Sequence, residues 1–180
     1  EKASRKSVYS IEDNMFRFWY RFVFENNSVI ARGAADLVYR RIEPMLSDYM
    51  GKVFEDICRQ YLWKQLLTGN CPVEFKSLGR WWGNDPFEKC QAEIDIMGEQ
   101  DKDTAVFAEC KWTNEKVDFS VLDTLAKRSK LFSYKNTRLY LFSKSGFSKG
   151  CIDEANKMGN VTLVSYKDIV LQTKDAKTAG

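Results

Sequence analysis

The first half of the chain carries apolar residues at helical spacing. One stripe has an apolar residue at every fourth position: Tyr49, Val53, Ile57 and Tyr61. It predicts a long helix over residues 48–67, with Ser47 as its N-cap. An earlier helix is predicted over residues 14–24, with Asp13 as its N-cap, and it is apolar on nearly every side. A helix of that kind has to be buried over most of its surface. It either fills one side of this protein's own core or docks against another module or a second copy.

The second half of the chain predicts strands interleaved with helices. Residues 73–78, 93–97 and 105–108 have strand-like patterns, and the polar turn 98–103 separates the last two. The pattern then predicts a helix from about residue 118 to 134, a strand over 137–143, a helix over 148–158, a strand over 161–166 and a final helical turn. A strand–helix–strand passage implies parallel pairing beside an otherwise antiparallel hairpin. The predicted fold class is therefore α/β, with one mixed sheet.

Acidic residues and a lysine lie on the two strands of the predicted hairpin. If the hairpin turns near Lys102, Asp95 lies opposite Glu109. Side chains alternate between the two faces of a strand, so Glu93 shares a face with Asp95, and Glu109 shares a face with Lys111. Cross-strand neighbours lie about 4.5–5.5 Å apart at Cβ. We therefore predict that two or three carboxylates and one ammonium group converge.

Such a cluster has a clear candidate chemistry. Carboxylates in an apolar setting repel each other and lose hydration, which raises their pKa, and a bound cation relieves both effects. Carboxylate oxygens suit Mg²⁺ or Mn²⁺, which also take water and phosphate as ligands. Lys111 is then placed to contact a phosphate or a metal-bound water. The alternative is that Lys111 neutralises one of the acids and that nothing else binds.

Composition narrows the mechanisms. The chain has 180 residues, 44% of them hydrophobic and 29% charged, as expected for one globular domain or one domain with an extension. It contains no histidine, which excludes a Ser-His-Asp triad, a Cys-His pair and histidine-ligated zinc. Its five cysteines show no C-x-x-C spacing, which favours reduced thiols in the cytoplasm. No apolar run is long enough to span a membrane, so no membrane association is expected.

Charge is distributed unevenly along the chain. The net charge is +3, but residues 51–112 carry −3 and residues 113–180 carry +5. An acidic centre beside a basic flank suits a phosphodiester substrate. Three basic residues near the end of the predicted helix 118–134 are candidates for contacts with a DNA backbone: Lys127, Arg128 and Lys130. They also suit the dipole of a helix C-terminus, and both interpretations stay open.

The acidic pattern resembles the PD-(D/E)XK nuclease superfamily. Asp95 matches the aspartate of that motif, Glu109 and Lys111 match its Glu-x-Lys, and Ile94 stands where the motif usually has proline. The resemblance implies a restriction-endonuclease-like core and catalysis by Asp95, Glu109 and Lys111. It also implies that Glu55, on the preceding helix, joins Asp95 and Glu109 as a metal ligand. From the residues alone, the favoured interpretation of Glu55 is a surface ion pair with Arg59; the resemblance favours the metal site instead.

A closer resemblance is to the domain of unknown function that follows archaeal-type AAA+ ATPases. It is carried by Tyr9–Tyr20, Gly51–Glu55, Trp81–Trp82 and Glu109–Trp112. It implies an ATPase module upstream in the same polypeptide. This chain has no Walker A motif of its own and is not expected to hydrolyse ATP itself. The predicted organisation is a helical N-terminal extension over 1–46, a nuclease-like domain over 47–171 and a disordered tail over 172–180. A homo-oligomer is left open.

Two functions follow from these resemblances. One is hydrolysis of DNA phosphodiesters with a divalent metal; the other is a catalytically silent module of the same fold that binds DNA or a protein partner for an ATPase. The paired Trp81 and Trp82 leave a second question open. Adjacent residues of a strand point to opposite faces, so at least one is expected in the core, whereas an exposed one could stack on a nucleic-acid base. Glu93 has no assigned role.

Overall fold

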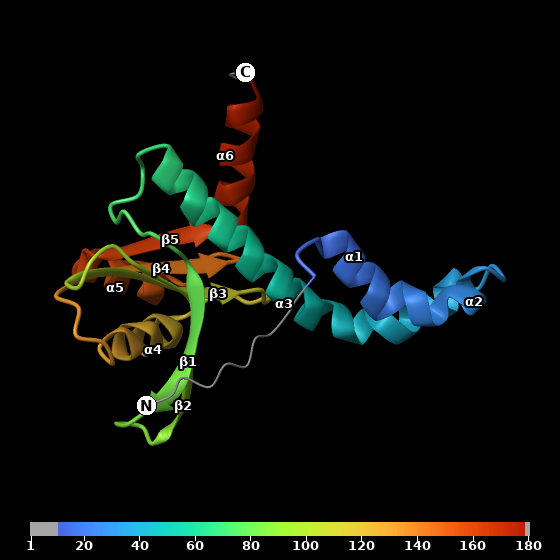
Figure 1. Cartoon of the computed structure of the whole chain (residues 1–180), viewed down its shortest axis with the longest axis horizontal. Helices are drawn as coiled ribbons and strands as arrows, with labels where there is room; N and C mark the ends of the chain where they lie inside the picture. The colour runs from blue at the N-terminus through green and yellow to red at the C-terminus, as the bar shows by residue number, and fades with distance from the viewer. Residues whose placement is uncertain (1–10, 179–180) are drawn as a thin grey trace. The chain divides into compact units, whose positions relative to one another are not determined.

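A computed structural model describes the backbone of residues 11–178 and the side chains of residues 11–172 (Figure 1). Residues 1–10 of the predicted extension, including Tyr9 and Ser10 of the closer resemblance, lie outside this range. The chain forms two compact units, Glu1–Tyr49 and Met50–Gly180, and helix α3 (Ala35–Leu67) contributes to both. None of the helices within residues 11–178 combines the length and the hydrophobicity that a transmembrane helix needs.

The first unit is a helical hairpin. Its first arm is helical from Asn14 to Ile30, in four consecutive pieces: α1 (Asn14–Phe18), a π-helix (Trp19–Val23), a 3-10 turn (Phe24–Asn26) and α2 (Asn27–Ile30). Asp13 caps α1 as predicted, because its side chain accepts hydrogen bonds from the N–H groups of Met15 and Phe16. Phe22 is buried and packs edge-on against Tyr49 of α3, at 5.4 Å between ring centroids.

The predicted burial of this first helix on most sides is wrong. Five of its large apolar side chains are exposed, from 42% for Trp19 to 78% for Met15: Met15, Phe16, Trp19, Tyr20 and Phe24. On the inner face Phe18 and Phe22 pack against Tyr49, because a two-helix hairpin offers each helix one packing partner. Docking against another module or a second copy stays a prediction.

The second unit is built on one five-stranded mixed sheet with the strands in sequence order. The strands are β1 (Gly79–Asp85), β2 (Cys90–Glu99), β3 (Thr104–Lys111), β4 (Asn136–Ser143) and β5 (Val161–Ser165). Neighbouring strands are antiparallel from β1 to β3 and parallel from β3 to β5. This arrangement confirms the predicted α/β class and the predicted change from antiparallel to parallel pairing.

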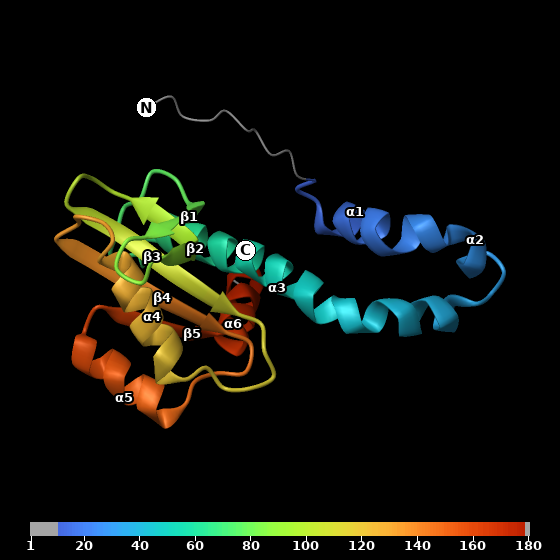
Figure 2. The ribbon, with the colours of Figure 1, turned by 90° about the horizontal axis from the view of Figure 1, so that it is seen from below.

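Helices cover both faces of this sheet (Figures 1 and 2). On one face, the second half of α3 and α6 (Tyr166–Thr178) enclose a core that includes Phe54, Leu62 and Phe142. On the other face, α4 (Phe119–Ser129) and α5 (Lys149–Met158) pack on residues that include Phe107 and Leu141. The buried strands β3 and β4 are apolar on both faces for this reason.

Three sequence predictions about the elements are wrong. Residues 73–78 form no strand; Val73 and Phe75 alternate into the core as expected, but this segment lies outside the sheet. Helix α3 begins at Ala35 rather than at residue 48 and passes through Pro44. Helix α6 continues to Thr178, into the segment predicted to be a disordered tail. The predicted functional boundaries at 46 and 171 stay predictions.

The glycines of this unit give a direct test of its packing. A Cβ on Gly98 of β2 would lie 2.8 Å from the backbone oxygen of Ser77, whereas a Cβ on Gly51 of α3 would meet nothing within 4 Å. We expect Gly98→Ala to lower the free energy of unfolding by about 1–3 kcal/mol, because backbone has to move. The matched Gly51→Ala should raise it by about 0.5–1 kcal/mol. Urea unfolding measures both, and equal effects would contradict this packing.

Candidate metal and phosphodiester site

The candidate site lies where β2 and β3 separate. The two strands pair from Glu99 and Ala105 to Ile96 and Ala108, and this register confirms that the hairpin is centred as predicted. One step further, Asp95 and Glu109 face each other with no ladder bond between them. Instead Oδ2 of Asp95 accepts a hydrogen bond of 2.8 Å from the backbone N–H of Cys110. We call this opening, with its carboxylates Glu55, Glu93, Asp95 and Glu109, the acidic fork.

An irregular register shapes the acidic fork. Gly79 of β1 pairs with Met97, but Trp81 pairs with Ile94, so β2 carries one extra residue between these pairs. As a result Ile94 packs on the α4 side of the sheet and Ile96 on the α3 side, although strict alternation would place them together. Asp95 lies at this shift, where a bulge re-aims a side chain. It is buried, as is Glu109.

Glu109 and Lys111 share a face, as predicted, and form one ion pair. The Nζ atom of Lys111 donates to Oε1 of Glu109 at 2.6 Å. Nη1 of Arg128, from α4, lies 3.9 Å from Oε2 of Glu109 and donates to the backbone oxygen of Glu93 at 2.7 Å. A cavity of about 220 Å³ opens beside these groups and is lined by Glu109, Lys111, Ser120, Val121, Thr124 and Arg128.

Arg80 of β1 is the residue of the site that the sequence analysis missed. Its Nη2 lies 3.4 Å from Oε1 of Glu55 and 3.9 Å from Oδ1 of Asp95. Its Nε contacts Oε1 of Glu93. No motif pointed to Arg80, because its place depends on how β1 pairs with β2. Arg59, the surface partner expected for Glu55, pairs with Asp56 instead, at 2.8 Å.

Burial and crowding of like charges shift the titration of the site. Burial, with the neighbouring Asp95, raises the pKa of Glu55 to about 7. The same two causes raise the pKa of Glu109. Burial acts against the charge of Lys111, but the adjacent Glu109 prevails and raises its pKa, so the ammonium is kept. The acidic fork therefore holds more negative charge than its surroundings readily stabilise.

The donor set fits a magnesium-type ion with two protein ligands. Asp95 and Glu109 are hard oxygen donors, and Mg²⁺ in proteins often takes one or two carboxylates and completes its shell with water and phosphate. A fuller cage is not formed: among the described side chains, residues 11–172, no three of histidine, cysteine, aspartate or glutamate are grouped to hold a metal. Glu55, the third ligand that the resemblance implies, is turned to Arg80.

Of the three basic residues suggested for DNA contacts, only Arg128 reaches the acidic fork. Lys127 pairs with Asp123 on the surface of α4 at 2.8 Å, and Lys130 is exposed beyond the end of that helix. Phosphate contacts by Lys127 and Lys130 stay a prediction.

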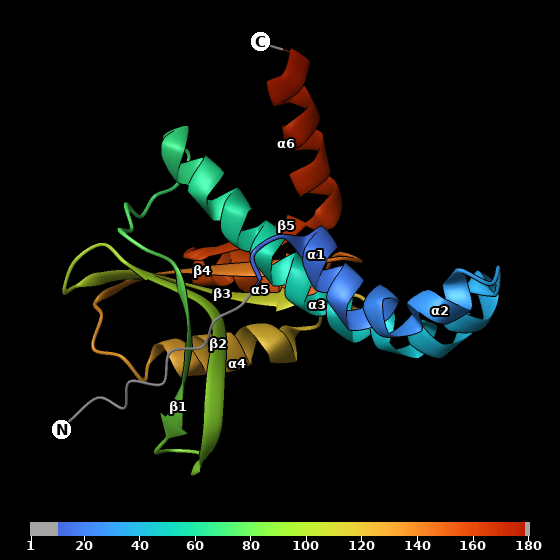
Figure 3. The same cartoon turned by 45° about the vertical axis from the view of Figure 1, so that its right-hand side comes forward.

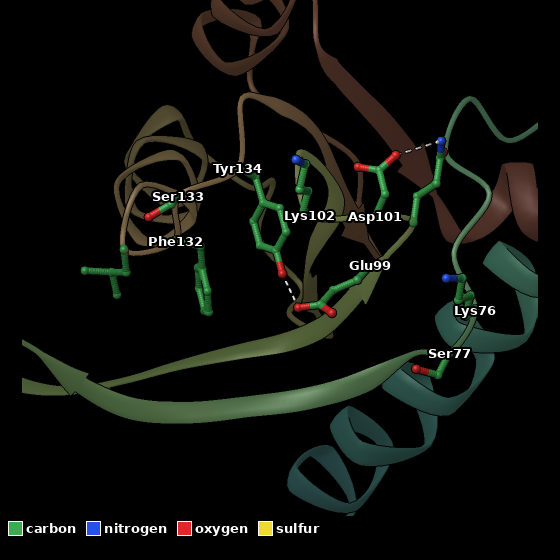
Figure 4. A pocket seen from close by; sticks show the side chains of 10 residues that line it. Lys76, Ser77, Glu99, Asp101, Lys102, Phe132, Ser133 and Tyr134 are labelled. Atoms are coloured by element: carbon green, nitrogen blue, oxygen red, sulfur yellow. Dashed lines mark hydrogen bonds between the residues drawn. The ribbon is translucent and has the colours of Figure 1, made fainter.

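A larger cavity, of about 820 Å³, lies at the turn end of the same hairpin (Figure 4). Its acidic groups are already engaged: the Tyr134 hydroxyl donates to Glu99, and Asp101 accepts from the N–H of Asp103. Burial and Glu99 raise the pKa of Tyr134 to about 12, so this phenol is no base at neutral pH. Size alone therefore does not make this cavity the functional site.

The raised pKa of Glu55 predicts a pH-dependent stability. The folded protein binds this proton with a pKa of about 7, compared with 4.5 for an ordinary glutamate. The contribution of this carboxyl group to the free energy of unfolding is fully present at low pH and is lost as the pH rises through about 7. Glu55→Gln resembles the protonated form at every pH, so its advantage over the wild type should grow by about 1–2 kcal/mol between about pH 5 and pH 8.

Urea unfolding with EDTA across this pH range measures the difference. Glu115→Gln, which changes an exposed carboxylate after β3, serves as the matched control and should show a constant difference from the wild type. An equally constant difference for Glu55→Gln would contradict the burial of this carboxylate beside Asp95.

Comparisons with known proteins agree in one respect: the matched proteins are of unknown function. A protein described as uncharacterized, MJECL04 of Methanocaldococcus jannaschii, is 33% identical over 114 residues, which make up 63% of this chain and 24% of that protein. The chain thus matches about a quarter of the length of this relative. The crystal structure of a protein of unknown function, AF1548, superposes with a TM-score of 0.41 and 18% identity, over 66% of this chain and 67% of that one. A likeness this remote carries no argument.

The family assignment rests on a longer match. Residues 19–122, which include Glu55, Arg80, Asp95, Glu109 and Lys111, match the family DUF234, described as archaeal and bacterial proteins of unknown function. More than half of the chain is covered by this match, and the protein belongs to that family.

Proposed function

We propose that this protein hydrolyses DNA phosphodiesters with a divalent metal, as a nuclease of the PD-(D/E)XK type with a restriction-endonuclease-like core. The observation that carries the proposal is the convergence of Asp95, Glu109 and Lys111 at the point where β2 and β3 separate. Two neighbouring buried carboxylates, of which Glu109 lines a cavity together with the ammonium group of Lys111, suit a phosphate with a metal ion. The matched family and the similar proteins are of unknown function, so they give no information on activity.

Each residue has a role in this proposal. Asp95 and Glu109 would hold Mg²⁺ or Mn²⁺, with Glu55 acting through a water. When bound, such an ion polarises a phosphodiester and lowers the pKa of a coordinated water. Lys111, held by Glu109 at 2.6 Å, stabilises negative charge that grows on the phosphate oxygens. Arg128 lines the same cavity and orients the phosphate through its guanidinium.

The partners follow from the resemblance. DNA is the substrate class of that superfamily, and the basic C-terminal segment agrees with a polyanion. An AAA+ ATPase module upstream in the same polypeptide is proposed because the closer resemblance is to a domain that follows such modules. The relative from Methanocaldococcus jannaschii extends well beyond the matched region, which is 24% of its length.

A second candidate is a catalytically silent module that binds DNA or a protein partner for an ATPase. It is favoured by the cations already present in the acidic fork. Arg80 contacts Glu55, Glu93 and Asp95, and Lys111 and Arg128 accompany Glu109. In a catalytically silent module these ion pairs neutralise the carboxylates permanently, and no metal ion is needed. In a nuclease, Arg80 gives way when metal binds.

Loss of one ligand separates the two candidates. We expect the wild type to bind Mg²⁺ or Mn²⁺ in calorimetry and to nick supercoiled plasmid. Asp95→Ala should lose both by roughly 100-fold or more, because a buried ligand is removed. Asp123→Ala, which changes the surface carboxylate paired with Lys127, is the matched control and should retain both. Metal binding without nicking, or no metal binding, would contradict the nuclease and favour the silent module.

Removal of Arg80 tests whether its guanidinium competes with the metal. Arg80→Gln withdraws one positive charge from three carboxylates, so we expect Mg²⁺ affinity to rise roughly threefold to tenfold at low ionic strength. Arg138→Gln is the control, since Arg138 donates to the backbone oxygen of Gly159 away from the acidic fork. An unchanged or weakened affinity in Arg80→Gln would show that the guanidinium does not compete with the ion.

A further inference from the structure

The two neighbouring tryptophans of β1 point to opposite sides of the sheet, as the sequence predicted. Trp81 packs edge-on against Phe132, with ring centroids 5.1 Å apart, in the core under α4. Gly83 makes room for that ring, because a Cβ there would lie 2.4 Å from Cζ2 of Trp81. Trp82 is 74% exposed. Core packing explains the first indole and leaves the second without a structural role.

The ribbon formed by β1 and β2 extends past the other strands (Figure 3). Trp82 belongs to a small pocket on this ribbon. The register pairs Trp82 with Glu93 and Asn84 with Gln91. Directly paired residues share a face, and residues two apart along a strand do so too, so these four side chains lie together. They surround a cavity of about 390 Å³, lined by Trp82, Gly83, Asn84, Gln91, Ala92 and Glu93.

The lining of this pocket has the chemistry of a nucleobase site. An exposed indole offers a flat face for stacking, and stacking tolerates any base. Asn84 and Gln91 each carry an amide that both donates and accepts hydrogen bonds, and such amides read base edges. The charge of Glu93 is compensated by Arg80, which limits repulsion of a nearby phosphate.

The pocket also adjoins the acidic fork. Glu93 lines the pocket and contacts Arg80, whose guanidinium in turn reaches Glu55 and Asp95. Arg128 connects the two places as well, through the backbone oxygen of Glu93 and the carboxylate of Glu109. The pocket therefore shares Glu93 with the acidic fork, so a strand that crosses the fork passes close to the pocket.

We propose that this pocket binds an unpaired base of the DNA strand whose backbone crosses the acidic fork, with Trp82 as the stacking residue and Asn84 and Gln91 as contacts to the base edge. The inference rests on the proposed function for its partner. It narrows the substrate to single-stranded or locally opened DNA, because a base inside a duplex is stacked on both faces and cannot reach the indole.

Binding without cleavage tests the pocket separately from the chemistry. Fluorescence anisotropy of a labelled single-stranded oligonucleotide is measured in EDTA with the wild type, Trp82→Ala, Trp82→Phe and Phe87→Ala. We expect Trp82→Ala to weaken binding about 5- to 150-fold and Trp82→Phe to retain most of it. Phe87, an exposed aromatic on the same ribbon but outside the pocket, is the matched control and should have no effect.

A second measurement locates the base. Oligonucleotides with a single abasic position, moved along the strand, should lose affinity for the wild type at one position and not for Trp82→Ala. The double variant Asn84→Ala, Gln91→Ala should reduce the preference among the four bases while retaining binding. These results together would support the pocket.

The other outcomes separate this inference from the proposed function. Equal binding by the wild type and Trp82→Ala, or a flat abasic scan, would overturn the base pocket and leave plasmid nicking to decide the nuclease. Binding that depends on Trp82, without nicking in Mg²⁺, would support the pocket and contradict the nuclease. Absence of DNA binding by the wild type would overturn the proposed base pocket and would favour a protein as the partner that contacts Trp82.

Discussion

Beyond Ile96 and Ala108 the backbones of β2 and β3 no longer pair, and the functional chemistry of the protein depends on that separation. An extra residue in β2 opposite β1 turns the β1–β2 ribbon away from β3 and sends Ile94 and Ile96 to opposite faces. Asp95 is left at the opening, where its carboxylate bonds the N–H of Cys110 in place of a ladder bond. Glu55 from α3 and Glu109 from β3 then meet the same aspartate from either side.

Electrostatics sets what this opening can hold. Four carboxylates share it with three cations, Arg80, Lys111 and Arg128. Burial raises the pKa of both Glu55 and Glu109, so the cations in place leave part of the negative charge poorly stabilised. A divalent ion would supply the missing charge. The proposed nuclease and its silent alternative differ in whether Arg80 yields to such an ion, while the pocket beside Trp82 concerns how the strand is held.

The local parts of this picture were predictable from the sequence, and the parts that depend on distant pairing were not. Polar residues between two apolar runs indicated the hairpin register, and the period of two placed Trp81 and Trp82 on opposite faces without indicating which one is buried. The position of Arg80 depends on the irregular pairing of β1 with β2, which no spacing reveals. Residues 73–78 alternate like a strand because Val73 and Phe75 enter the core, yet they form no strand, although the N–H of Lys76 donates to the backbone oxygen of Glu99 in β2. Pro44 indicates a break but lies within α3.

The most direct test of the central claim is the crystal structure of the protein with Mn²⁺, with anomalous diffraction to locate the ion. If Asp95 and Glu109 hold the metal, we expect a single manganese peak between their carboxylates, with the guanidinium of Arg80 withdrawn from Asp95. A map without a peak in the acidic fork, and with Arg80 still against Glu55 and Asp95, would contradict a metal-dependent site there.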